Sequence, residues 1–122
     1  MEHLTIQDNT KLINEAYRVL NKKGKLIITT PNYLGPWVIV EKIVNFFGAV
    51  SYDDQHITFF NKNNIKDFLK KFGFKKITIT TNMSFAPFFA FFGWKLPDFI
   101  QKIEDKYFNN SYRLFLVVVC EK

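Results

Sequence analysis

Hydrophobic and polar positions along the chain predict a helix followed by a strand at the start. Apolar side chains recur at helical spacing over residues 8–20, and Gly24 provides the stop. Residues 25–30, KLIITT, are rich in β-branched side chains and almost continuously apolar. That pattern is typical of a strand covered on both faces. Pro31 and Asn32 then end the strand in a polar turn.

Two helices are predicted in the middle of the chain. Residues 37–47 are apolar around most of the helical circumference, so we expect this helix to be buried or to form a lid. Residues 61–72 give the clearest amphipathic pattern, with Asn61 as the N-cap and Gly73 at the C-terminal stop.

The last part of the chain predicts two strands separated by a long insertion. Residues 75–81 alternate as a half-buried strand does, and residues 113–121 are continuously apolar, as in a central strand. The insertion, residues 82–110, is aromatic and ends in a helix. The element order predicts one α/β domain over residues 1–122, with helices on both faces of a small sheet.

Charge and composition narrow the functional classes. The net charge of +6 is carried mostly by lysines near predicted helix ends, where they complement the helix dipole. Only two arginines occur and no nucleic-acid-binding motif appears, so no nucleic-acid partner is expected. The single cysteine, Cys120, excludes an intrachain disulfide and a multi-cysteine zinc site. The polar start does not read as a signal peptide, so a cytoplasmic location is expected.

Five short motifs follow one another in a specific order. They are Glu2-His3-Leu4, Arg18-Val19-Leu20 before the Gly24 turn, Pro31-Asn32 after a strand, His56 with Phe59-Phe60 before a helix, and Gly73-Phe74 after it. This order resembles the C-terminal half of class I S-adenosylmethionine (SAM)-dependent methyltransferases. The nearest type is the methyltransferase-11-like group, which includes small-molecule, quinone and lipid methylases.

The resemblance implies a partial Rossmann-like methyltransferase sheet made of the last three strands. The final strand, residues 113–121, would be central and antiparallel, between residues 25–30 and 75–81. The chain would begin about where the family's fourth strand ends. None of its five glycines forms the GxGxxG turn that brings a cofactor close to the backbone. SAM is therefore expected in an intact parent, and no cofactor is expected to bind this chain alone.

The resemblance also implies candidate site residues on the cofactor side. Glu2 and His3 would lie beside the cofactor, and His3 is a weak candidate for a general base. Because they follow Met1 directly, we expect this end to fray.

The acceptor side is represented by four candidates. Asn32, Tyr33, Trp37 and His56 would bind the substrate at the carboxyl edge of the sheet. Ordinary turn chemistry explains the Pro-Asn pair equally well. Adjacent carboxylates such as Asp53-Asp54 seldom converge on one ion, so no metal site is predicted beside His56.

The block FAPFFAFFGWKLPDF, residues 85–99, is the most unusual segment. We expect it to be buried against the helix at residues 37–47. A cap over an apolar acceptor, such as a quinone, a lipid or a polyprenyl compound, is the alternative. A membrane contact is the least favoured of the three, because the block has no clear basic face.

These observations favour the acceptor-side half of a SAM-dependent methyltransferase acting on a small apolar molecule, inactive alone. A non-catalytic α/β module that binds a partner chain, and a peripheral membrane-binding protein, are the alternatives. The edge of the strand at residues 25–30 is expected to be open. It would recruit a second copy or an N-terminal half, because open apolar edges attract partners.

Overall fold

A computed structural model describes residues 1–47, 55–83, 85–107 and 113–122. The elements confirm the predicted order and add one short 3₁₀ helix, η1, inside the insertion. In chain order they are α1 (Ile6–Val19), β1 (Lys25–Pro31), α2 (Trp37–Phe47), α3 (Lys62–Lys70), β2 (Lys76–Asn82), η1 (Ala86–Phe92), α4 (Lys95–Tyr107) and β3 (Phe115–Glu121).

The three strands form one antiparallel sheet in the order β1-β3-β2. Val118 of β3 is paired with Ile28 of β1 on one side and with Ile79 of β2 on the other. The prediction that the last strand is central and antiparallel to both neighbours is confirmed. The three consecutive valines of β3 suit a strand interior, and ladder hydrogen bonds form along both edges of this strand.

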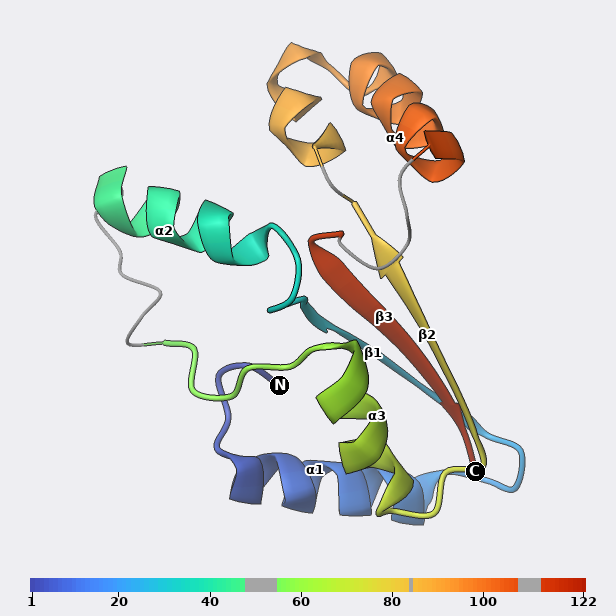
Figure 1. The fold of residues 1–122 in the computed structure, drawn as a ribbon. Coiled ribbons are helices and arrows are strands. Elements are labelled where there is room, and N and C mark those ends of the chain that lie inside the picture. Colours follow the sequence, from blue (N-terminus) through green and yellow to red (C-terminus); the bar gives the residue numbers. More distant parts are fainter. Residues whose placement is uncertain (48–54, 84, 108–112) are drawn as a thin grey trace.

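Helices α1 and α3 cover one face of the sheet, and the core lies between them and the strands (Figure 1). Ile13 of α1, Ile65 and Leu69 of α3, and Leu116 and Val118 of β3 are fully buried there. The expected burial of Cys120 is confirmed, and burial raises the pKa of its thiol to about 11.

The expectation that helices cover both faces of the sheet is wrong for the described residues. Ile27 on the second face is 65% exposed, and Val117 and Val119 beside it are only half-buried. Side chains alternate between faces along β1, so its apolar run supplied both a buried face and an open one. A run of this kind says that both faces are apolar, but it does not show that both are covered.

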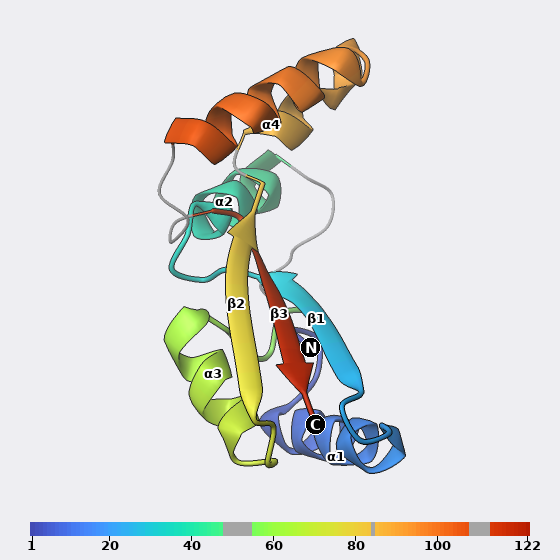
Figure 2. The ribbon, with the colours of Figure 1, turned by 90° about the vertical axis from the view of Figure 1, so that its right-hand side faces the viewer.

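The remaining helices gather at one end of the sheet, where β1 and β2 finish (Figures 1 and 2). Helix α2 was expected to be buried or to form a lid, yet Glu41 is its only buried residue. The aromatic block was expected to be buried against α2, but Phe91 and Trp94 are largely exposed. The burial predicted for the aromatic block is therefore wrong, and so is the buried alternative for α2, whereas the lid alternative stays a prediction.

Two side chains fix the position of η1 and α4 at this end. Buried Glu104 of α4 accepts hydrogen bonds from the backbone N–H groups of Phe85 and Ala86, at the start of η1. Arg113 donates to the Asp105 carboxylate and to the Glu104 carbonyl. The insertion is thus held by buried polar contacts that the apolar pattern of α4 does not reveal.

No helix in the described parts of the chain combines the length and the apolar character needed to cross a bilayer.

Candidate functional site

The turn after β1 is built around Asn32, whose side chain is fully buried. Its amide nitrogen donates to the Arg113 carbonyl (2.9 Å), and its amide oxygen accepts from the backbone N–H of Leu34 (3.2 Å). The same turn brings Gly35 against the residues that lead into β3, where an added Cβ would overlap the Arg113 carbonyl oxygen. Asn32 therefore ties the turn to the central strand, which supports turn chemistry as its role.

Tyr33, the next residue, begins a buried polar cluster with His56 and Glu41. The Tyr33 hydroxyl lies 2.6 Å from His56 Nδ1, and the same nitrogen lies 2.7 Å from Glu41 Oε1. His56 and Glu41 are both buried. Because a carboxylate can only accept, Nδ1 of His56 carries a hydrogen and donates it to Glu41. The ring of His56 is thereby fixed in orientation by α2 and by the turn after β1.

This environment perturbs Tyr33. Burial, followed by the negative charge of Glu41, raises the pKa of the Tyr33 phenol to about 12. The indole N–H of Trp37 faces the phenol oxygen closely enough to oppose part of this shift, although it forms no hydrogen bond of ordinary geometry. Tyr33 is thus a neutral hydroxyl throughout the physiological pH range.

Aromatic rings enclose the cluster. Trp37 lies 6.4 Å from His56 and 5.2 Å from Phe115 between ring centroids, and Tyr33 lies 4.7 Å from Phe59. A hollow of about 210 Å³ opens beside it, lined by Tyr33, Val38, Glu41, Lys42 and Phe59. A small ligand entering this hollow would meet the Tyr33 phenol and the Glu41 carboxylate.

The amino-terminal residues are held in place, so the expectation that they fray is wrong. The Glu2 carbonyl accepts from the backbone N–H groups of Ile57 (2.7 Å) and Thr58 (3.1 Å). His3 Nδ1 donates to the Gln55 carbonyl (3.0 Å). These bonds to the segment before α3 bring the His3 ring to 4.9 Å from the His56 ring, between centroids.

The Glu2 carboxylate faces the same region and stays ionised. Burial opposes its ionisation, but hydrogen bonds from its own backbone N–H, from the Met1 amino group and from the Thr30 hydroxyl together lower the pKa of Glu2. The Thr30 bond is 3.1 Å long, and the other carboxylate oxygen lies 3.8 Å from His3 Nε2. A carboxylate and an imidazole therefore stand side by side near the end of β1.

The structure brings most of the predicted site residues together. Those that converge on the carboxyl end of β1 are Glu2, His3, Tyr33, Trp37 and His56. Asp53 and Asp54 lie outside the described residues. No group of three or more potential ligands that could hold a metal occurs among the residues that are described.

Glu41 is the site residue that sequence reasoning missed. It is the one acidic residue in α2, and it stands one helical turn after Trp37. A lone carboxylate on the same face as a tryptophan, in an otherwise apolar helix, was the available signal.

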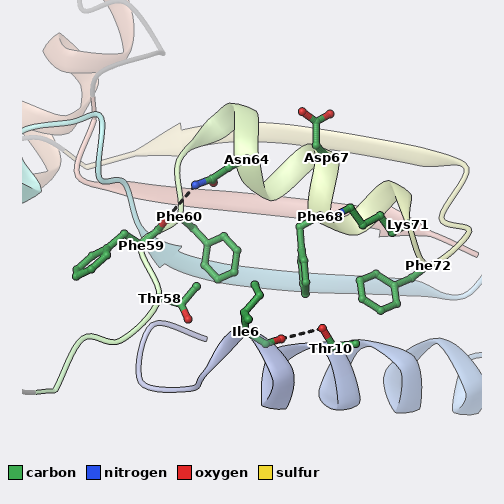
Figure 3. A pocket seen from close by; sticks show the side chains of 10 residues that line it. All are labelled: Ile6, Thr10, Thr58, Phe59, Phe60, Asn64, Asp67, Phe68, Lys71 and Phe72. Atoms are coloured by element: carbon green, nitrogen blue, oxygen red, sulfur yellow. Dashed lines mark hydrogen bonds between the residues drawn. The ribbon is translucent and has the colours of Figure 1, made fainter.

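A second hollow lies elsewhere, between α1 and α3, and measures about 560 Å³ (Figure 3). Most of the polar side chains that line it are engaged in local bonds. Asn64 donates to the Phe59 carbonyl, Thr10 donates to the Ile6 carbonyl, and Asp67 pairs with Lys70. The groove has aromatic walls but no pair of groups arranged for chemistry, so the cluster around His56 is the better candidate site.

Solved structures that share this fold include two methyltransferases. A SAM-dependent methyltransferase from Archaeoglobus fulgidus matches with a TM-score of 0.64 at 15% identity, over 99% of this chain and 55% of that one. The fold matches part of a SAM-dependent methyltransferase. The phosphoethanolamine N-methyltransferase 2 of Haemonchus contortus, solved with phosphomonomethylethanolamine and S-adenosylhomocysteine, matches with a TM-score of 0.52 at 19% identity. That match covers 99% of this chain and 31% of the other.

The chain thus spans about half the length of the first methyltransferase and about a third of the second. No family model and no curated protein matches the sequence.

Of the described residues, the resemblance assigns only Glu2 and His3 to a SAM site. Glu2 and His3 are the candidate contacts, and one Glu2 oxygen already accepts from Met1 and Thr30. The two glycines with positive φ, Gly73 and Gly93, follow helices rather than forming a cofactor turn. These residues do not fit the whole cofactor, so no chemical step is derived through it.

Proposed function

We propose that this chain is the acceptor-side portion of a SAM-dependent methyltransferase whose acceptor is a small apolar molecule. The observation that carries the proposal is the convergence of His3, Tyr33, Glu41 and His56 at the carboxyl end of β1, in a fold that matches methyltransferases. Ligands of open α/β sheets bind outside that edge.

The side chains suit two separate tasks. His56 and Tyr33, held by Glu41 and enclosed by Trp37, would position the acceptor in the adjoining hollow. His3 is exposed, its Nε2 lies 3.8 Å from the Glu2 carboxylate, and an imidazole is a group that takes up protons in general base catalysis. His3 is therefore the candidate base, and Tyr33 and His56 are candidate positioning residues.

The first test is calorimetry of the chain with SAM. The Gly-rich turn and the ribose-binding carboxylate of the family would supply two or three hydrogen bonds, and charged bonds contribute roughly 1.5–3 kcal/mol each. Their loss amounts to several powers of ten in affinity, so we expect no saturable binding by this chain alone. Saturable micromolar binding would show that the cofactor site is assembled from other residues.

The second test supplies the complementary portion. The chain is co-expressed with any in-frame segment encoded upstream of Met1 that contains a Gly-rich strand-turn-helix, and methyl transfer to quinone and lipid acceptors is measured. We expect activity that falls by about 10²–10⁴-fold in His3→Ala, the range typical of a lost general base. Lys66→Ala on the exposed side of α3 is the matched control and should retain activity.

A stable complex without any methyl transfer would instead support the non-catalytic partner-binding module. Activity unaffected by His3→Ala, but lost in Tyr33→Phe and His56→Ala, would leave the methyltransferase proposal standing and remove His3 as its base.

A further inference from the structure

The end of the molecule formed by α2, η1 and α4 exposes an unusual number of aromatic rings. Phe46 and Phe47 at the end of α2 are each 81% exposed. Phe91 and Trp94, on either side of the turn from η1 to α4, are 92% and 77% exposed. Large exposed apolar areas of this kind mark interaction surfaces in soluble proteins. We call the surface carried by these three helices the aromatic cap.

An apolar groove makes the cap one surface rather than separate patches. It measures about 330 Å³ and runs between α2, which contributes Ile39 and Ile43, and η1, which contributes Phe88, with Phe85 just before it. Every side chain that lines it is apolar. The groove lies on the part of α2 that points away from Glu41, so it is distinct from the cluster around His56.

The cap is also positively charged. Four lysines of α2 and α4 are exposed and form no ion pair with any described residue: Lys42, Lys95, Lys102 and Lys106. Lys106 does lie 5.0 Å above the Tyr107 ring.

The acidic residues of α2 and α4 do little to neutralise these four lysines. Glu41 is buried against His56, and Glu104 is buried against the start of η1. Asp105 is paired with Arg113, which leaves Asp98 as the remaining exposed carboxylate of these helices.

We propose that the aromatic cap docks on an anionic lipid surface. Exposed Trp and Phe rings favour the interfacial region of a bilayer, and lysines beside them are attracted to anionic head groups. A second copy of this chain is a poorer occupant, because it would bring four more unneutralised lysines to the same contact. The block at residues 85–99 contains only Lys95, but α4 continues beyond it and exposes Lys102 and Lys106 at helical spacing from Lys95, so the cap as a whole combines rings and positive charge.

The test is flotation of the full chain with vesicles of phosphatidylcholine alone and of phosphatidylcholine mixed with phosphatidylglycerol. We expect binding to the anionic vesicles that weakens as salt rises, and little binding to the neutral ones. Each lysine near such a surface contributes about five-fold in partitioning, so the triple variant K95Q/K102Q/K106Q should bind roughly a hundredfold more weakly. The variant F91A/F92A/W94A should lose binding.

Matched controls lie on the opposite end of the molecule. K62Q/K66Q/K71Q removes three exposed lysines around α3, and L12A/V19A removes exposed apolar side chains of α1. Both should bind as the parent chain does. Circular dichroism and urea denaturation of each variant separate a loss of binding from a loss of folding.

Three outcomes would overturn the proposal. They are absence of binding to anionic vesicles, equal losses in the two lysine variants, and a dimer that F91A/F92A/W94A abolishes while vesicle binding is absent. The first outcome would exclude an anionic lipid surface as the partner of the cap. The second would mean that the positive charge of the whole protein causes the attraction. The third would mean that a second copy of the chain binds the cap. None of them bears on methyl transfer, so this inference and the proposed function fail separately.

Discussion

Removal of the Glu41 carboxylate should destabilise the fold and uncouple α2 from His56. Glu41 is buried and lies 2.7 Å from Nδ1 of a histidine that is also buried. In Glu41→Ala that ring N–H loses its carboxylate acceptor, while the Tyr33 oxygen stays 2.6 Å from the same nitrogen. A hydrogen bond to a charged group contributes about 1.5–3 kcal/mol, so with partial compensation by Tyr33 we expect a loss of about 2 kcal/mol.

The expected loss is a large fraction of the free energy of unfolding of the whole domain. At about 0.05–0.15 kcal/mol per residue, a domain of this length has a free energy of unfolding of roughly 6–18 kcal/mol. A loss of about 2 kcal/mol should lower Tm by roughly 6–12 °C, by interpolation between the values for smaller and larger domains. Urea denaturation followed by tryptophan fluorescence measures it, because Trp37 lies 6.4 Å from the His56 ring.

A double-mutant cycle with His56→Ala tests the reasoning directly. If the contact between Glu41 and His56 causes the loss of stability, the two substitutions are non-additive, with a coupling free energy of about 1–2 kcal/mol. Lys42→Ala, on the exposed side of the same helix, is the matched control and should change stability by less than about 0.5 kcal/mol. Additive effects of Glu41→Ala and His56→Ala would refute the coupling and, with it, the account of how α2 is positioned.

Three further predictions concern the turn after β1 and the edge of the sheet. The Tyr33 phenol should titrate near pH 12, measured by phenolate absorbance against Tyr33→Phe. Because the unfolded chain loses this proton near pH 10, the folded state holds more protons between the two values, and the free energy of unfolding should fall as pH rises through that window. Gly35→Ala should cost about 1–3 kcal/mol in urea denaturation, since its Cβ would overlap the Arg113 carbonyl; unchanged stability would mean that the turn relaxes freely. The edge strand β1 should promote self-association, and sedimentation of a monomer at high concentration would argue against it.

The sequence alone determined the elements and much of their order. The pattern around Asn61 predicted the start of α3, where its side chain accepts from the N–H groups of Asn63 and Asn64. Gly73 has the positive φ of 87° that its place after α3 suggested. The apolar run of β3 predicted a central strand, which the pairing confirms. These features depend on neighbouring residues and on the periodicity of apolar side chains, so a local sequence pattern is enough to predict them.

Tertiary structure decided which apolar surfaces are covered. The apolar patterns of helix α2 and the aromatic block predicted that they would bury one another. They line a groove together, but Phe46 and Trp94 stay exposed. Hydrophobicity shows what a side chain would gain from burial, but burial also requires a surface that the chain brings within reach.

Tertiary structure also decided which residues meet at the candidate site. Tyr33 and His56 are 23 residues apart, and His3 and Gln55 are 52 apart. The pattern of the sequence identified Tyr33 and His56 separately but gave no reason to join them through Glu41. Their contact depends on how the sheet, α2 and the segment before α3 are packed, because hydrogen bonds form only at distances and angles that the whole fold sets.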